Sequence, residues 1–151
     1  MIELRRANQA DREYLNGVAW RAKAHWQYPA EWLESWRDQL TLTEDYLNRH
    51  HVFVAQYDKA ILGFTAVIPL EDGIWEIDHL WIDPPFMGRG AGRLLYQKAL
   101  ETVRGEGAPR LMILSDPNAR PFYERMGAVL REEVPSSIPG RSLPLMEVIL
   151  Y

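Results

Sequence analysis

The 151-residue sequence contains no cysteine, carries no excess of positive charge and has no long apolar run. Without cysteine the chain can form no disulfide, no thiolate metal site and no cysteine-linked acyl intermediate. Its formal charge of -4 gives no general attraction to nucleic acid or anionic lipid, so an anionic ligand must be held by local groups. No apolar run approaches the roughly 18 residues that span a bilayer, and the polar start is unlike a signal peptide. We expect a cytoplasmic protein of one domain, residues 1–151, that binds neither nucleic acid nor membrane.

The four histidines form no metal-binding pattern. They are His25, His50, His51 and His79, which are scattered or adjacent in the sequence. None of them makes the i, i+4 pair that a helical zinc site uses. We therefore expect no metal site.

Hydrophobic periodicity predicts seven strands. They are expected at 2–7, 51–57, 60–70, 74–83, 110–114, 128–134 and 144–151. The strands at 51–57, 60–70 and 74–83 form a meander of antiparallel strands, and the later strands follow a strand-helix-strand order. This order predicts an α/β (α+β) fold with a mixed sheet and helices on both faces.

Helical patterns lie between these strands. Residues 14–19 predict a first helix with Asn8 or Asp11 as its cap, and two further helical stretches lie on either side of Pro29. A longer helix is predicted by an apolar stripe of residues spaced by four, which ends near Gly105 and Gly107. The stripe consists of Ala91, Leu95, Ala99 and Val103. A short helix is expected at 118–126, closed by Gly127.

The segment "DPPFMGRGAGR" at 83–93 lies between a predicted strand and a predicted helix. A glycine-rich turn at a helix N-terminus points several main-chain N–H groups into one concavity, where the helix dipole adds about half a positive charge. Gly88, Gly90 and Gly92 let the main chain approach a phosphate, while Arg89 and Arg93 add charge at the rim. The spacing fits neither a Walker loop nor a Rossmann turn. The alternative interpretation is a flexible turn that opens a helix.

Two motifs resemble those of one enzyme family. The run "HLWIDPPFMGRGAGRLL" at 79–95 resembles the acetyl-CoA-binding motif of the GNAT N-acetyltransferases, and "NARPFYERMGA" at 118–128 is similar to the second motif of that family. The two occur in the family's order and at its usual distance. Met87 departs from the pattern, because the family usually has Gln or Arg there. Since main-chain N–H groups hold most of the diphosphate, this departure should weaken a rim contact more than abolish binding.

The resemblance implies a fold and a way of binding acetyl-CoA. The fold is a mostly antiparallel sheet of six to seven strands, in which the strands at 74–83 and 110–114 splay and admit pantetheine like an added strand. Leu80 and Ile82 would then bond pantetheine through their main chain, and the Leu80 N–H would polarise the thioester carbonyl. Asn118 would bond the pantetheine arm, or simply cap a helix. The diphosphate would lie on residues of the glycine turn, namely Met87, Gly88, Arg89, Gly90, Ala91, Gly92 and Arg93.

The resemblance also implies a direct transfer reaction. Tyr123 would act as the general acid for the departing thiolate, since a phenol pKa near 10 lies only about 1.5 units from a thiol near 8.5. The alternative is a core aromatic beside Phe122. Glu76 is the first candidate for the general base, while Asp78, His79 and water remain open. Glu76 can act only if burial raises its pKa or if it accepts the proton after attack.

The acceptor is predicted only as a class. We expect an N-acetyltransferase that acetylates a primary amine of a small molecule or peptide by direct attack in a ternary complex, with acetyl-CoA as cosubstrate. The resemblance is compatible with a homodimer. The acceptor walls would be residues 20–36 and 135–144, where five aromatic residues line a pocket or belong to the core. These are Trp20, Trp26, Tyr28, Trp32 and Trp36. Arg141 would pair with an acceptor carboxylate or be solvated. A non-catalytic acyl-CoA sensor and a nucleotide-binding regulatory module remain as alternatives.

Overall fold

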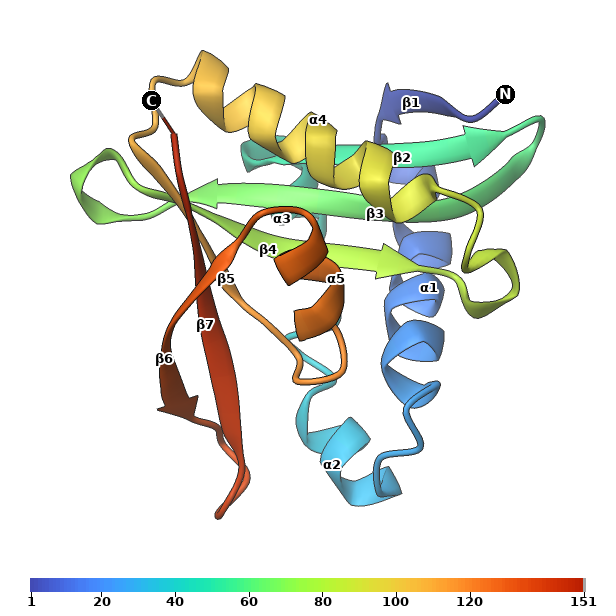
Figure 1. Cartoon of the computed structure of the whole chain (residues 1–151). Coiled ribbons are helices and arrows are strands. Elements are labelled where there is room, and N and C mark those ends of the chain that lie inside the picture. The colour runs from blue at the N-terminus through green and yellow to red at the C-terminus, as the bar shows by residue number, and fades with distance from the viewer. Residues whose placement is uncertain (151) are drawn as a thin grey trace. The chain divides into compact units, whose positions relative to one another are not determined.

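The computed structural model describes residues 1–150, with seven strands and five α-helices in that range (Figure 1). The strands are β1 (Glu3–Arg6), β2 (His51–Tyr57), β3 (Ala60–Pro69), β4 (Trp75–Ile82), β5 (Arg110–Leu114), β6 (Val129–Pro135) and β7 (Ser142–Ile149). They form one sheet in the order β1-β2-β3-β4-β5-β7-β6. The pairs β1/β2, β5/β7 and β6/β7 are antiparallel, whereas β4 and β5 are parallel. This confirms the predicted mixed, mostly antiparallel sheet.

The helices are α1 (Arg12–Ala24), α2 (Ala30–Ser35), α3 (Glu44–Arg49), α4 (Ala91–Gly105) and α5 (Arg120–Arg125). The chain divides into two compact units: Met1–Ala66 with His79–Lys98, and Val67–Asp78 with the chain from Ala99 onward. The strands β3 and β4 and the helix α4 contribute residues to both.

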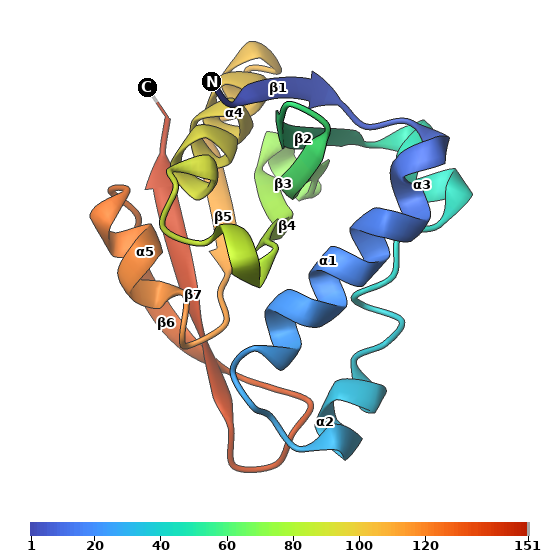
Figure 2. The same cartoon turned by 90° about the vertical axis from the view of Figure 1, so that its right-hand side faces the viewer.

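In the first unit, α1 and the start of α4 lie on opposite sides of β1, β2 and β3 (Figure 2). The inner face of α1 is formed by Leu15, Val18 and Ala19, all fully buried. On the other side, Ala91 and Leu95 of α4 pack with Ala55 and Leu62. Burying such apolar surface is the main source of stability for both helices.

The turn into α1 is fixed by a capping box. The Asn8 side chain accepts the Ala10 N–H over 3.0 Å, and Asp11 Oδ2 accepts the Asn8 N–H over 2.8 Å. Arg5 binds both oxygens of Asp11, at 2.8 and 2.9 Å. The predicted capping residues are therefore correct, although they cap a short 3-10 turn (Gln9–Asp11) that leads into α1.

Strands β3 and β4 approach closely at Gly63. A Cβ placed there would overlap the main-chain carbonyl oxygen of Trp81 and lie 2.8 Å from Ile82 Cδ1. A glycine in a strand is unfavourable by itself and often marks such a close main-chain approach. Here it is required by the neighbouring strand.

In the second unit, Leu111, Ile113 and Met146 form the buried side of β5 and β7. The register joins Leu111 to Val148 and Ile113 to Met146. On β7, Glu147 is 6% exposed. It accepts from Arg110 Nη1 at 2.9 Å and from Arg131 Nη1 at 3.3 Å, so its buried charge is paired twice.

Several strand boundaries differ from the sequence prediction by one residue, and other differences are larger. The helix α3 was not predicted; it begins after Thr43, whose side chain accepts the Tyr46 N–H at 3.1 Å. The helix α5 begins at Arg120, two residues after the predicted start. The strand β7 begins at Ser142, opposite Pro135, and so includes Pro144, where the prediction placed its start.

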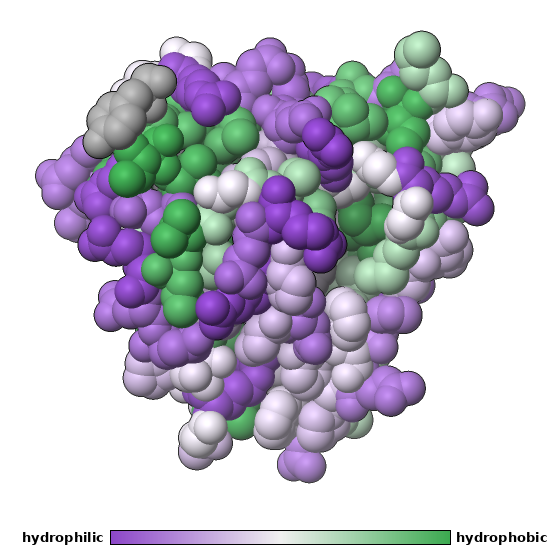
Figure 3. Space-filling view, viewed as in Figure 1, coloured by the Kyte–Doolittle hydropathy of each residue, from purple (hydrophilic) through white to green (hydrophobic). Residues whose placement is uncertain are grey.

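On the face shown in Figure 3, hydrophilic residues are interspersed with separate hydrophobic patches. Exposed large hydrophobic side chains within the described range include Val129, Tyr57 and Ile149. Scattered apolar residues of this kind are normal on a protein surface. Within residues 1–150, no helix is long and apolar enough to cross a membrane.

Candidate active site

The glycine turn after β4 has the conformation expected of an anion-binding loop. Gly88 has φ of 80° and Gly90 has φ of 88°, main-chain angles that residues other than glycine adopt only at a cost in free energy. A Cβ at either position would meet no atom within 4 Å, so both face open space. The helix α4 then begins at Ala91, and its first N–H groups have no partner within the helix. The turn therefore offers main-chain donors to a ligand at a positive helix end.

The rim of this turn carries two arginines and Met87. Arg89 and Arg93 are exposed, and Arg89 Cζ lies 5.6 Å from the centroid of the Phe86 ring. Met87 is 39% exposed and supplies no charge. Main-chain N–H groups as the principal donors, with Arg89 and Arg93 at the rim, stay a prediction.

Leu80 and Ile82 belong to the same unit as the turn. Both are partly buried and pack against the cluster of Ala55, Leu62, Ala91 and Leu95. Their side chains anchor the end of β4 beside the start of α4. The structure therefore brings Leu80, Ile82 and residues 87–93 together in one unit.

Glu76 lies on the part of β4 that belongs to the second unit, where it pairs in register with Met112. Burial, together with the negative charge of Asp78, raises the pKa of Glu76 to about 7. An ordinary glutamate has a pKa near 4.3, so this carboxyl is unusually well suited to exchange protons near neutral pH.

His79 is buried, with 5% of its surface exposed. Trp81 Nε1 donates to His79 Nδ1 over 2.9 Å, and the Phe64 and Tyr46 rings lie 5.8 and 5.7 Å from the imidazole centroid. His79 therefore points into the core.

Tyr123 of α5 is 6% exposed, and its ring packs edge-to-face on Phe122 with centroids 5.2 Å apart. Burial and this ring contact hold the aromatic ring in place. The alternative role as a core aromatic is compatible with the same geometry. The second unit thus contains both Glu76 and Tyr123.

Asn118 does not cap α5. The N-cap residue is Ala119, while the Asn118 N–H and side-chain amide both donate to Asp116 Oδ1, at 2.8 and 3.0 Å. The other oxygen of Asp116 lies 3.5 Å from Arg141 Nη2, and both side chains are largely buried. Arg141 is therefore paired within the chain rather than solvated.

The five aromatic residues near α1 and α2 form separate groups. Tyr28, Trp32 and Trp36 pack together with centroids 5.1 to 6.1 Å apart. The Lys23 Nζ lies 4.5 Å from the Trp36 ring centroid, a cation–π contact. Trp26 instead packs edge-on against His25. These groups do not line one common pocket.

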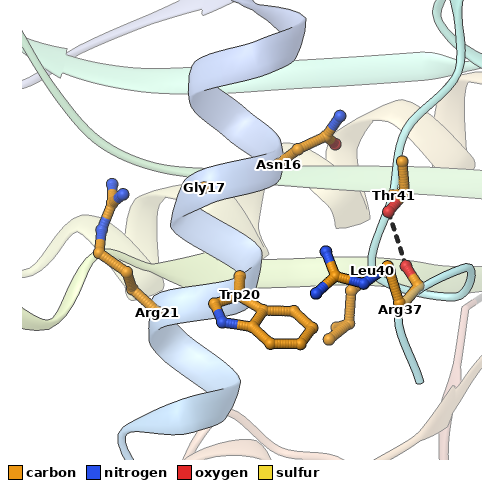
Figure 4. Close-up of a pocket in the computed structure, with 7 residues that line it drawn as sticks. All are labelled: Asn16, Gly17, Trp20, Arg21, Arg37, Leu40 and Thr41. Carbon is orange, nitrogen blue, oxygen red and sulfur yellow. Dashed lines mark hydrogen bonds between the residues drawn. The ribbon is translucent and has the colours of Figure 1, made fainter. Parts of the chain in front are cut away.

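Trp20 lines a different cavity, between α1 and residues 37–41. Its volume is about 310 Å³, and Arg37 Cζ lies 4.4 Å from the Trp20 ring centroid. Figure 4 shows Trp20 and Arg37 facing one another there, with Arg21 on the other side of α1. Among the described residues, no cluster of His, Asp and Glu has the geometry of a metal site.

Sequence reasoning missed one ion pair next to the glycine turn. Arg21 of α1 binds both carboxylate oxygens of Asp83, which immediately follows β4. The two residues lie 62 positions apart, and neither belongs to a periodic pattern that would link them. No signal in the sequence pointed to this contact.

Comparison with known proteins identifies the family. The model described as "Acetyltransferase (GNAT) family" matches residues 17–128. The chain belongs to the GNAT acetyltransferase family. The matched range includes every predicted donor-binding and catalytic residue of this GNAT acetyltransferase, and Arg141 lies outside it. The chain therefore belongs to a family of acetyltransferases, whose acyl donor is acetyl-CoA.

Individual relatives agree with this assignment. The chain is 36% identical over 81 residues to a mycothiol acetyltransferase from Thermomonospora curvata, a match that covers 50% of this chain but only 27% of that protein. A GCN5-related N-acetyltransferase from Rhodopseudomonas palustris has a TM-score of 0.81 at 21% identity, covering 98% of this chain and 95% of that one. PaiA N-acetyltransferase from Thermoplasma acidophilum, solved in complex with coenzyme A, has a TM-score of 0.81 at 19% identity and 99% coverage of both chains. At these identities the two structures show that this GNAT acetyltransferase shares their fold.

Proposed function

We propose that the chain transfers an acetyl group from acetyl-CoA to a primary amine of a small molecule or peptide, by direct attack in a ternary complex. The observation that supports this most is the turn at Gly88 and Gly90, whose left-handed main chain faces open space ahead of α4. Such a concavity of N–H groups fits a diphosphate. Family membership supplies acetyl-CoA as the diphosphate-containing donor.

The residues of this chain would share the binding of the donor. Main-chain N–H groups of residues 88–93 bind the diphosphate, with Arg89 and Arg93 adding charge at the rim. The main chain of Leu80 and Ile82 bonds the pantetheine arm, and Asn118 adds a side-chain contact. Acetyl-CoA itself supplies the activated thioester.

Each proposed catalytic group has one task. Glu76 accepts a proton from the amine, and its pKa of about 7 narrows the gap to an ammonium from about 6 units to about 3. The Leu80 N–H donates to the carbonyl oxygen as negative charge develops on it. The new carbon–nitrogen bond forms, the carbon–sulfur bond breaks, and Tyr123 donates its phenolic proton to the leaving sulfur.

A donor-binding measurement tests the first part of this proposal. Calorimetric titration of the chain with acetyl-CoA should show saturable binding. Absence of binding at millimolar acetyl-CoA would overturn the proposal. Competition by ATP at equal concentration would instead favour the nucleotide-binding module.

A thiol-release screen tests the second part. The amine panel should contain polyamines, amino acids, aminoglycosides and peptide N-termini. It should also contain the amine acceptor of mycothiol acetyltransferases, because one relative of this chain is a mycothiol acetyltransferase. Release above background with one class would identify the acceptor. Tight donor binding without release for any amine would favour a sensor.

A further inference from the structure

The ion pair between Arg21 and Asp83 joins α1 to the turn that opens the glycine loop. Arg21 Nε donates to Asp83 Oδ1 and Arg21 Nη2 donates to Asp83 Oδ2, each over 3.0 Å. Two parallel charge-assisted bonds give this contact a defined direction as well as strength. Asp83 is 3% exposed, so its carboxylate requires a cationic partner inside the protein.

The carboxylate of Asp83 has no role as a helix cap. Asp83 precedes the 3-10 turn Pro84–Phe86, a position where aspartate usually accepts an N–H from the following residues. Pro84 and Pro85 have no N–H to donate. The Phe86 N–H donates to the Asp83 carbonyl oxygen over 2.8 Å. The main chain of Asp83 thus shapes the turn, and its side chain is committed to Arg21.

Gly17 leaves room for Arg21 to reach Asp83. The two residues are four apart on α1, so the arginine side chain leans back over the glycine. A Cβ at position 17 would lie 2.9 Å from Arg21 Nη1, and all three of its nearest neighbours would be guanidinium atoms of Arg21. In Figure 4, Arg21 extends alongside Gly17 toward the start of α1. A methyl group at position 17 would press on Nη1, the guanidinium nitrogen that does not bind Asp83, so the arginine side chain would have to shift.

The glycine loop is anchored at both of its ends. At Gly88 and Gly90 no atom lies within 4 Å of a potential Cβ, so no neighbour packs against the loop on that side of these two residues. One end of the loop is the start of α4. The other is the turn at Asp83, whose N–H donates to the Leu62 carbonyl oxygen of β3 over 2.8 Å.

We propose that Arg21, acting through Asp83, is a positioning residue for acetyl-CoA. The ion pair fixes the start of the loop, so that the N–H groups of residues 88–93 stay directed at one diphosphate. Preorganised donors bind more tightly because less conformational freedom is lost on binding. This inference rests on the proposed function, since it assumes that the loop binds the donor.

Two variants remove the same contact by different routes. Arg21→Gln deletes the guanidinium, whereas Gly17→Ala keeps it but forces it to shift. Arg21→Gln should raise the dissociation constant of acetyl-CoA and its KM about 5- to 20-fold while kcat stays within twofold, and Gly17→Ala should raise both by a smaller factor, about 2- to 5-fold. The double variant should bind acetyl-CoA as tightly as Arg21→Gln alone does, because both changes act through one ion pair.

Thermal stability separates positioning from general damage. Arg21→Gln should lower Tm, since Asp83 keeps a buried charge without its partner. Gly17→Ala should keep or raise Tm, because alanine is a better helix former than glycine. Weaker donor binding in a variant of undiminished stability is a result that a merely structural role would not give. Gly17→Ala also keeps the inference testable if Arg21→Gln fails to fold.

The matched control is Arg5→Gln. Arg5 also binds both oxygens of a buried carboxylate, Asp11, in the same unit. This variant should lower Tm like Arg21→Gln but leave the affinity for acetyl-CoA unchanged. If both Arg21→Gln and Gly17→Ala bound acetyl-CoA with the affinity of the parent chain, this inference would be overturned and the proposed function would stand. Failure of the parent chain to bind acetyl-CoA would overturn the proposed function and the inference with it.

Discussion

The indole Nε1 of Trp81 donates a hydrogen bond of 2.9 Å to Nδ1 of His79. An indole N–H can only donate, so Nδ1 must be the acceptor and a neutral His79 carries its proton on Nε2. Neither nitrogen can then take up a proton without breaking the bond to Trp81. Among the side chains considered for the general base, this geometry disfavours His79 and leaves Glu76 as the stronger candidate.

Glu76 should control the acidic limb of the pH–rate profile. A general base must be deprotonated, so kcat/KM should rise with pH around the Glu76 pKa of about 7. Glu76→Gln should remove this limb and lower the rate about 100-fold. Asp78→Asn should shift the limb to lower pH, because the negative charge of Asp78 contributes to raising the Glu76 pKa. Steady-state rates between pH 5 and 9 test both variants, and an unchanged profile for Glu76→Gln would exclude it as the base.

The same carboxyl should make folding stability depend on pH. The Glu76 pKa is about 7 in the folded chain and near 4.3 when unfolded, so the folded chain binds the proton more tightly. Its contribution is therefore most favourable below about pH 4.3 and is lost as pH rises through 7. The free energy of unfolding of Glu76→Gln should therefore increasingly exceed that of the parent chain as pH rises through this range. The difference should be only about 1 kcal/mol at pH 8, because water screens a partly buried group. Urea unfolding at pH 5 and pH 8 measures the difference, and a gap that shrinks with rising pH would contradict the expected sign.

The positions of several strands and of α4 were predictable because these segments carry strong apolar patterns. The predicted ranges 51–57 and 110–114 coincide with β2 and β5. The predicted stripe from Ala91 to Val103 is fully or almost fully buried on α4. In these elements, local periodicity and tertiary packing favour the same structure.

The sequence was less informative where side chains compete with the main chain. Asn118 has a good capping side chain, yet it donates to Asp116 instead, so α5 starts later than predicted. Arg141 lies in a polar loop and reads as solvated, but it pairs with the largely buried Asp116. Such long-range polar contacts leave no periodic signal. The roles of the predicted site residues and a homodimer stay predictions.

Tyr123 should affect chemistry more than donor binding. Tyr123→Phe removes the proposed proton donor but keeps the ring that packs on Phe122. The expected result is a loss of kcat of at least tenfold with an unchanged dissociation constant for acetyl-CoA. Tyr96→Phe is the control, since Tyr96 is also buried, at 1% exposure, but lies outside the proposed site. Equal kcat values for the two variants would remove Tyr123 from the mechanism.

Gly88 should be required for donor binding rather than for folding. At φ of 80°, Gly88→Ala costs about 1 kcal/mol of main-chain strain, and no neighbour clashes with the new methyl group. The altered loop should weaken acetyl-CoA binding at least tenfold. Gly107→Ala is the matched control, because Gly107 has φ of 77° and equally open surroundings after α4. Thermal unfolding should show similar losses of stability in the two variants. Calorimetry should show weakened acetyl-CoA binding in Gly88→Ala alone. Parental affinity for acetyl-CoA in Gly88→Ala would argue against this loop as the diphosphate site.

Gly63 should be the glycine least tolerant of substitution for folding. The methyl group of Gly63→Ala would meet the Trp81 carbonyl oxygen and lie 3.1 Å from Ile82 Cα, both parts of the main chain of β4. Main-chain atoms cannot rotate away, so relief requires β3 and β4 to separate, at a cost of about 3 kcal/mol. Gly105→Ala is the control: its Cβ would meet nothing within 4 Å near the end of α4, so it should be neutral or slightly stabilising. Urea unfolding compares the two. If Gly63→Ala stayed within 1 kcal/mol of the parent chain, the close approach of the two strands would not be a constraint on the fold.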